Sequence, residues 1–187
     1  MSNLVLASKS PRRRELFTFI TSSFICCETD IDETKYDNLN AEQQVLFLAR
    51  DKCLYAYKDY PKSVVIGCDT LVDLNGRVMG KPMDRNDAFQ MIKALSGNTH
   101  KVFTGVAIKT EADFINFAVE TEVTFFDMTD EEIAEYVSSG EADDKAGAYG
   151  MQSKASKYIR GIKGDYFNVI GLPVSLIYRY LHEKNIV

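Results

Sequence analysis

Segments with the pattern of β-strands alternate with segments with the pattern of α-helices along this chain. Leu4–Ala7 and Val64–Gly67 are short apolar runs of the kind found in buried strands, whereas a helical spacing of apolar residues follows Asp84. Thr99–Lys109 and Phe114–Phe126 predict a long antiparallel hairpin. Hairpins and crossovers therefore occur together, which predicts a mixed sheet with flanking helices in an α/β or α+β domain, with α/β favoured, rather than a purely parallel sheet.

Capping signals set the predicted helix starts. Ser10 and Pro11 suit the cap and first turn of a helix that we expect to run to about Ile20. The spacing of a capping box at Asn40 and Gln43 predicts a helix to about Tyr57, and Thr129 with Glu132 repeats that pattern. The other predicted elements are strands at Phe24–Glu28, Thr70–Leu74, Arg77–Met79 and near Tyr158–Ile162, a turn at Asn75-Gly76, and a final helix after Pro173.

Length and charge narrow the class of protein. A chain of 187 residues can bury one sizeable core, so we expect a single domain over residues 1–187. The formal charge of -5 argues against a non-specific nucleic-acid binder, whose surface would be basic. No stretch approaches the roughly 18 apolar residues that span a bilayer. We therefore expect no nucleic acid and no membrane among its partners.

The four cysteines argue against a zinc site and for a reducing compartment. They occur as Cys26-Cys27, Cys53 and Cys68, without a CxxC pair, and the chain has only two histidines. Reduced, buried thiols are the expected state. Together with the absence of a leader-like apolar start, this predicts a cytoplasmic protein.

The segment Ser8–Arg14 has the composition of an anion site. It places two serine hydroxyls and three consecutive arginines at a predicted helix N-terminus, where backbone N–H groups are unpaired and the helix dipole is positive. Arginine also makes bidentate bonds to phosphate. A triphosphate would suit this segment, although a capped surface helix with solvated arginines explains it equally well.

Two acidic residues are candidates for catalysis or metal binding. Asp69 is predicted where a buried apolar strand ends, a place where α/β folds often hold catalytic carboxylates. A structural role as a turn or capping residue explains its position equally well. Glu33 lies in an acidic segment predicted to be a loop, which a solvated surface would also explain. Magnesium needs only one or two protein carboxylates beside substrate oxygens, so Asp69 and Glu33 would suffice.

Two further segments could contact a nucleotide. The segment Gly76–Pro82 is not a phosphate-binding loop of the Walker type, but Lys81 could place a charge near phosphate, as could Lys52 from the preceding helix. The glycine-containing segment Asp144–Gln152 could approach a ligand closely, and Gln152 could pair with a base edge. Tight packing is the commoner reason for such small residues.

Taken in order, these segments resemble the Maf family, also called septum formation inhibitor proteins, over nearly the full chain. The matching segments are Leu6–Arg13, Gly67–Thr70, Gly80–Pro82, Leu95–Gly97, Asp144–Gln152 and Gly171–Pro173. The resemblance implies a fold related to the inosine triphosphate pyrophosphatases, with two lobes around a cleft, and commonly a homodimer. It also implies a nucleoside triphosphate pyrophosphatase.

The resemblance also assigns roles to residues. It implies that Asp69 is the proton acceptor, with Glu33 and Lys81 as catalytic partners. The positions associated with choosing the nucleotide are matched by Arg12, Thr70 and Gln152, and other substrate-binding positions by Ser8, Arg13 and Lys52. At the positions of Arg12 and Thr70, this sequence resembles the branch of the family that hydrolyses dTTP and UTP.

We therefore expect hydrolysis of dTTP and UTP to the nucleoside monophosphate and pyrophosphate, with Mg²⁺ or Mn²⁺ as the divalent cofactor bound by Asp69 and Glu33. One alternative is a nucleotide-binding regulator of cell division without turnover. Another is the same chemistry on 7-methyl-GTP or CTP.

Overall fold

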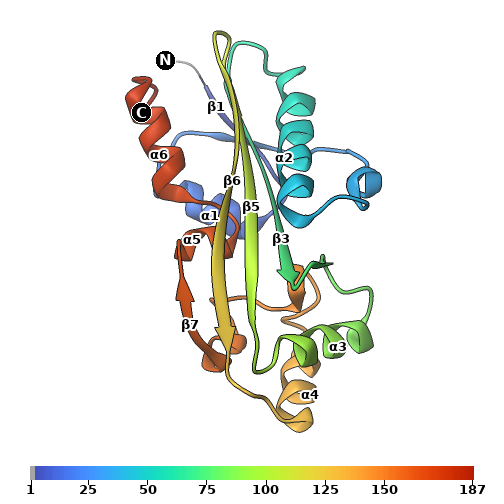
Figure 1. Cartoon of the computed structure of the whole chain (residues 1–187). Coiled ribbons are helices and arrows are strands. Elements are labelled where there is room, and N and C mark those ends of the chain that lie inside the picture. Colours follow the sequence, from blue (N-terminus) through green and yellow to red (C-terminus); the bar gives the residue numbers. More distant parts are fainter. Residues whose placement is uncertain (1–2) are drawn as a thin grey trace. The chain divides into compact units, whose positions relative to one another are not determined.

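A computed structural model describes residues 3–187 as a mixed sheet with helices around it (Figure 1). In chain order the elements are β1 (Leu4–Ala7), α1 (Pro11–Phe17), β2 (Ile25–Cys27), η1 (Glu33–Tyr36), α2 (Ala41–Tyr57), β3 (Val64–Leu74), β4 (Arg77–Met79), α3 (Arg85–Leu95), β5 (Thr99–Lys109), β6 (Phe114–Phe125), α4 (Asp130–Ser138), η2 (Ala146–Ala148), η3 (Lys154–Tyr158), β7 (Ile159–Lys163), α5 (Tyr166–Ile170) and α6 (Val174–Glu183), where η marks a 3₁₀ helix. Among the helices of residues 3–187, none combines the length and the apolar character of a membrane span.

The sheet has seven strands in the order β2-β1-β3-β5-β6-β7, with β4 paired to β3. β1 runs parallel to both β2 and β3, whereas the pairs β3–β4 and β6–β7 are antiparallel. The prediction of an α/β fold with a mixed sheet is therefore confirmed.

The chain divides into two compact units. Unit 1 comprises Met1–Asp69, Thr104–Val119 and Gly171–Val187, and unit 2 comprises Thr70–Phe103 and Glu120–Ile170. Since β3, β5 and β6 each contribute residues to both, the boundary crosses these strands, and it separates Asp69 from Thr70.

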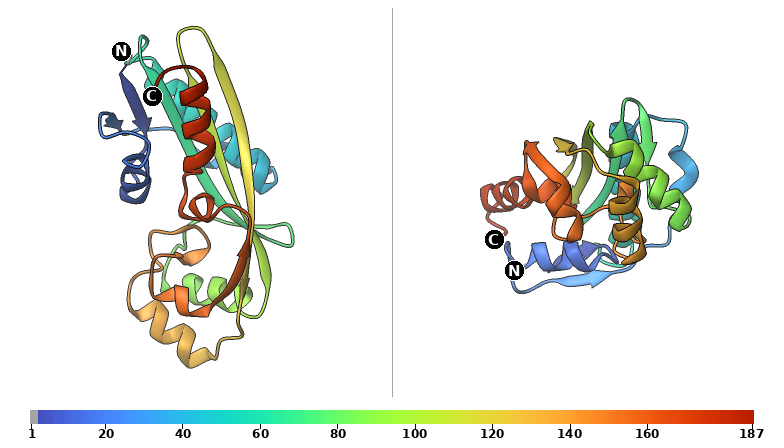
Figure 2. Two further views of the ribbon diagram at one scale, coloured as in Figure 1. Left: turned by 90° about the vertical axis from the view of Figure 1, so that its left-hand side faces the viewer. Right: turned by 90° about the horizontal axis from the view of Figure 1, so that it is seen from below.

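In unit 1, α2 and α6 cover opposite faces of the sheet, as the two views in Figures 1 and 2 show. Two glycines let α2 lie close to the strands. A Cβ atom on Gly67 of β3 would overlap the backbone of Ala49 and Cys53, and one on Gly105 of β5 would overlap the backbone of Val45. One core cluster here consists of small and β-branched residues, namely Val5, Ala7, Ala49, Cys53, Ala56, Val65 and Ala107.

Unit 2 has a larger core beneath α3 and α4, which pack against each other. Ile92 and Leu95 of α3 and Ile133 of α4 are fully buried, as the helical spacing of apolar residues after Asp84 predicts. Thr129 caps α4 with a complete capping box, also as predicted.

Several predicted boundaries are wrong. α1 ends at Phe17 rather than near Ile20, because the backbone N–H groups of residues 18 to 20 donate to carbonyls three residues back, and the Thr18 hydroxyl also donates to the Glu15 carbonyl. The two predicted strands at Val64–Gly67 and Thr70–Leu74 form one strand, β3. The 3₁₀ helices and α5 are additional, since one turn of helix leaves too short a pattern to recognise.

Candidate active site

Lys52 of α2 joins two carboxylates in unit 1. Its Nζ donates to Asp69 Oδ1 at 2.6 Å and lies 2.7 Å from Glu33 Oε1. The side chains of Lys52 and Asp69 are 10% and 11% exposed, whereas that of Glu33 is 59% exposed. One buried ammonium group therefore pairs with one buried and one accessible carboxylate.

Close packing of α2 on β3 produces this arrangement. Gly67 precedes Asp69 by two residues, so both face the same side of β3, and its lack of a Cβ lets the backbone of α2 approach. Lys52 lies on the α2 turn that contacts Gly67 through Ala49 and Cys53. The absence of a side chain at Gly67 thus allows the α2 turn that carries Lys52 to lie close to β3 next to Asp69.

Asp69 does not lie at the end of a strand, contrary to the prediction. β3 continues to Leu74, because its later part pairs with β4. The parallel pairing with β1 nevertheless ends at Ala7 and Gly67, immediately before Cys68 and Asp69. Asp69 therefore follows the carboxyl end of the parallel part of the sheet, where such folds usually bind ligands.

The helix-start segment is held by its own hydroxyl groups and by Gly171. Ser8 Oγ accepts from the backbone N–H of Ser10 at 3.2 Å, and Ser10 Oγ from that of Arg13 at 3.4 Å. Arg13 Nε donates to the Gly171 carbonyl at 2.8 Å, which fixes the guanidinium group. The predicted cap is confirmed, and Arg12 is half-buried on the same short helix.

Charged groups from this segment and from α2 both act on the Cys68 thiol of β3. Burial raises the pKa of the Cys68 thiol to about 11, and Asp69 raises it too, while the positive charges of Arg13 and Lys52 oppose the rise. Arg13, Lys52 and Asp69 thus all act on the thiol of one β3 residue. Residues from four elements, including Glu33 of η1, form the candidate site of unit 1.

Unit 2 contains Thr70, Lys81 and Gln152. Thr70 is half-buried on β3, and Lys81 and Gln152 are exposed in the segments after β4 and Gly150. The backbone N–H of Gly147 donates to the Gly80 carbonyl at 2.9 Å, so the two segments are joined next to Lys81.

The segment that leads to Gln152 has a constrained backbone. Gly147 and Ala148 both have a positive φ, of 66° and 62°. A Cβ atom at Gly147 would lie 2.8 Å from a methyl group of Val72, and the Tyr136 hydroxyl donates to the Ala148 carbonyl at 3.2 Å. Ala148 thus carries backbone strain of the kind that clusters at functional sites.

The donor set for a metal is limited to two carboxylates. Within residues 3–187, no group of three or more histidine, cysteine or acidic side chains gathers at one point. Asp69 and Glu33 do converge on one positive charge, that of Lys52. Two carboxylates with phosphate oxygens are enough for magnesium, so these residues fit a divalent cation that arrives with a nucleotide.

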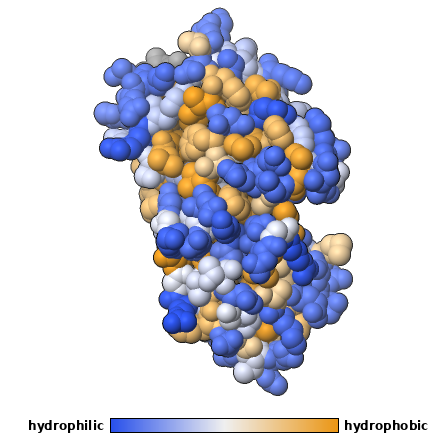
Figure 3. Space-filling model, in the orientation of Figure 1, coloured by the Kyte–Doolittle hydropathy of each residue, from blue (hydrophilic) through white to orange (hydrophobic). Residues whose placement is uncertain are grey.

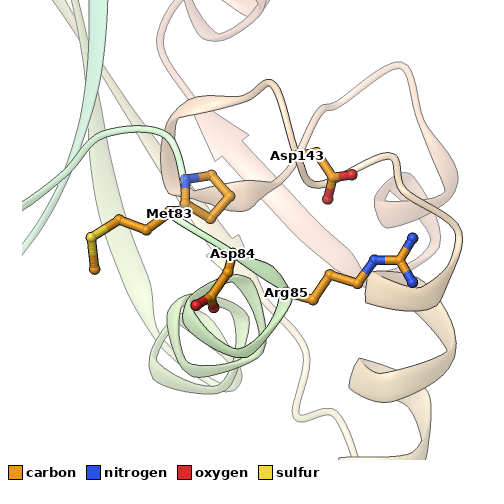
Figure 4. Close-up of a pocket in the computed structure, with 5 residues that line it drawn as sticks. Met83, Asp84, Arg85 and Asp143 are labelled. Atoms are coloured by element: carbon orange, nitrogen blue, oxygen red, sulfur yellow. The ribbon is translucent and has the colours of Figure 1, made fainter.

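A shallow pocket of about 360 Å³ lies elsewhere in unit 2. It is lined by Pro82, Met83, Asp84, Arg85 and Asp143 (Figure 4). Met83 points away from Asp143 in this view and is 89% exposed. None of the predicted site residues lines this pocket, although Lys81 directly precedes it in the chain.

Comparisons with known proteins agree over the full length. The family model described as "Maf-like protein" matches residues 3–184. Two relatives carry the name "dTTP/UTP pyrophosphatase": a protein of Geobacillus sp. (strain WCH70), 44% identical over 94% of each chain, and one of Bacillus pumilus (strain SAFR-032), 42% identical over 100% of this chain and 98% of its own. The solved Ham1 protein of Staphylococcus aureus has a similar fold, with a TM-score of 0.53, 12% identity, and coverage of 98% of this chain and 100% of its own. The chain belongs to the Maf-like protein family.

Proposed function

We propose that this protein is a nucleoside triphosphate pyrophosphatase that hydrolyses dTTP and UTP to the monophosphate and pyrophosphate. The relatives with this name are 39% to 44% identical and align along their whole length. The observation that carries the chemistry is the buried Lys52–Asp69 pair, with Glu33 at its accessible side. A buried, charge-paired carboxylate next to a cluster of arginines suits a reaction on phosphate.

Asp69 is assigned as the general base. Lys52 engages Oδ1, so Oδ2 is the oxygen that we assign to the attacking water. Water adds to the α phosphorus, its proton passes to Asp69, and the bond between that phosphorus and the bridging oxygen breaks to release pyrophosphate. The buried ion pair keeps the carboxylate in one orientation, which favours a fixed geometry of attack.

The arginine segment and Lys81 are assigned to the phosphates. Arg13 is held by Gly171, so its guanidinium group is oriented before a ligand arrives. Mg²⁺ or Mn²⁺ would be held by Asp69 and Glu33 and would neutralise negative charge on the triphosphate. Arg12, Thr70 and Gln152 are assigned to recognition of the pyrimidine base and sugar.

The cellular setting is also a proposal. Free thiols at all four cysteines suit the cytoplasm.

A homodimer is favoured by the edge of β6. The pairing of β6 with β7 covers Glu122–Phe125, so Phe114–Val119 lie outside that pairing, and Phe114 is 38% exposed. A strand edge of this kind can pair with or pack against another chain. Figure 3 shows apolar surface where β6 lies in unit 1. Light scattering of the purified protein would give the mass of a dimer, and a monomer at all concentrations would refute it.

The test of the proposed function is pyrophosphate release from dTTP, UTP, CTP, GTP, ATP and 7-methyl-GTP, with magnesium, with manganese and with a chelator. We expect activity on dTTP and UTP that the chelator abolishes and either metal restores. A folded protein that binds these nucleotides without releasing pyrophosphate would instead be a regulator. Preference for 7-methyl-GTP or CTP would retain the chemistry and refute the substrate.

A further inference from the structure

The Lys52 ammonium group contacts Glu33, which comes from a short and exposed helix. η1 spans only Glu33–Tyr36, and none of its residues is buried. An isolated turn of 3₁₀ helix is unstable in water, so contacts outside it must keep Glu33 near Lys52.

One such contact is a hydrogen-bonded cluster between Tyr36 and α2. The Tyr36 hydroxyl donates to Asp51 Oδ2 at 2.7 Å and accepts from Arg50 Nη2 at 3.0 Å. Arg50 also donates twice to Asp51 Oδ1, at 2.9 and 3.0 Å. The phenol is therefore bonded to two charged groups that are themselves paired.

Aromatic packing supports the same cluster. The rings of Tyr36 and Phe47 lie 5.1 Å apart, and the Arg50 guanidinium group lies 4.8 Å from the centre of the Phe47 ring. Partial burial pushes the pKa of Asp51 up, but the hydrogen bonds from Tyr36 and Arg50 outweigh this and lower it. Asp51 is thus a negative charge stabilised by the residues that hold η1.

The geometry of a 3₁₀ helix connects this cluster to Glu33. Side chains three residues apart lie on the same side of such a helix, so Glu33 and Tyr36 project together. Their partners, Lys52 and Asp51, are adjacent in α2. The two pairs therefore form parallel links between η1 and α2.

The rest of the segment has separate attachments. Asp32 Oδ1 accepts from the backbone N–H of Thr34 at 3.0 Å and caps η1. After η1, the buried Gln44 donates to the Leu39 carbonyl at 2.8 Å. Between these points, the Tyr36 cluster and the Glu33–Lys52 pair hold η1 to α2, together with a longer and exposed ion pair of 3.7 Å between Lys35 and Asp51.

We propose that Tyr36 is a positioning residue, which keeps Glu33 against Lys52 and Asp69 through its hydroxyl bonds to Asp51 and Arg50. This inference rests on the proposed function of Glu33. Tyr36 acts through Glu33 and has no role of its own with the substrate. Its removal should therefore have no effect once Glu33 has lost its charge.

The test is a double-mutant cycle of Tyr36→Phe and Glu33→Gln, measured as kcat/KM for dTTP. The phenylalanine keeps the ring packing and removes only the hydroxyl, so we expect a loss of about threefold to tenfold for Y36F alone. In the E33Q background the same change should cost less than about twofold. The matched control is Tyr180→Phe, because the Tyr180 hydroxyl also donates to an aspartate of unit 1, Asp113 Oδ2, at 3.2 Å. Y180F should leave kcat/KM for dTTP unchanged.

Hydrogen–deuterium exchange of residues 33–39 provides a readout that does not depend on activity. We expect faster exchange in Y36F and wild-type exchange in Y180F. Unchanged exchange in Y36F would overturn the proposal even if the protein had no turnover. Additive losses in the cycle, or a loss in Y36F while E33Q is fully active, would also overturn it. If E33Q alone abolishes activity and Y36F matches wild type, Tyr36 has no positioning role while the proposed function remains.

Discussion

Lys52 Nζ and Asp69 Oδ1 lie 2.6 Å apart, and both side chains are almost completely buried. Charged groups of this kind are stable inside a protein only as a pair, because desolvation of a single charge is expensive. A third charged group, the more exposed Glu33 carboxylate, contacts Lys52 from the solvent side and does not replace Lys52 as a partner of Asp69. Loss of the lysine and loss of the aspartate therefore have different consequences.

Lys52→Met should destabilise the protein much more than Asp69→Asn. The first change leaves the buried Asp69 carboxylate without its cation, at a cost of about 3 kcal/mol or more. The second leaves Lys52 paired with Glu33 and keeps an oxygen that accepts its hydrogen bond. Urea unfolding at pH 7.5 measures both free energies of unfolding. Equal stability of the two variants would show that the ion pair does not behave as a buried pair.

Gly147→Ala should destabilise unit 2 through a specific collision. The added methyl group would meet Val72 at 2.8 Å, in a backbone conformation that alanine already disfavours. Gly140→Ala is the matched control: φ is +77°, but the nearest atom to its Cβ is Asp143 Oδ2, at 3.7 Å. We expect a loss of about 1 kcal/mol for G140A from the backbone alone. The loss for G147A should be clearly larger, and equal losses in thermal unfolding would exclude the contact with Val72.

Stability should fall as the pH is lowered, because of His100. Its Nε2 lies 2.7 Å from the buried Tyr149 hydroxyl, and burial lowers its pKa to about 4. Between pH 4 and the ordinary value of about 6.5, the unfolded chain binds a proton that the folded protein does not, so stability rises with pH. The full stability is present above about pH 6.5, and the loss of stability at low pH due to His100 is at most about 3 kcal/mol. The difference between wild type and His100→Gln in urea should shrink from pH 7 to pH 4.5; a constant difference would contradict this.

The cysteines should differ in reactivity. Burial raises the pKa of Cys53 to about 12 and that of Cys68 to about 11, so neither forms a thiolate near neutral pH. Cys26 and Cys27 of β2 are only half-buried, contrary to the expectation of buried thiols throughout. A disulfide reagent at pH 8 should label at most two cysteines in the native protein and all four in urea. Rapid labelling of a Cys26→Ser, Cys27→Ser variant would contradict the assignment.

Local patterns explain why most of the fold could be predicted. The caps at Ser10, Asn40, Asp84 and Thr129 are sequence-local and all form in the structure. The sequence divides the strand β3 after Gly67, because the acidic Asp69 ends its apolar run, and it gives no sign that α2 packs on Gly67. A close approach of two backbones depends on tertiary structure, which a sequence pattern does not report.

Candidate site residues were found where the sequence carries them in compact motifs. Asp69, Lys81 and Gln152 belong to such segments, and Arg13 to another. The structure adds their partners, which are distant in sequence: Gly171 for Arg13, and Asp51 with Arg50 for Tyr36. The pair of His100 and Tyr149 is separated by 49 residues. Side-chain contacts of this range depend on the fold and have no local signal.

Pyrophosphate release from dTTP and UTP by Asp69→Asn tests the account most directly. The matched control is Asp73→Asn on the same strand, where Asp73 Oδ1 accepts from the Gly76 N–H at 3.0 Å and an asparagine can do the same. With Asp69 as general base, D69N should lose at least about 100-fold in kcat, while D73N retains wild-type activity. Activity in D69N close to that of D73N would show that Asp69 is not the base and would contradict the proposed mechanism.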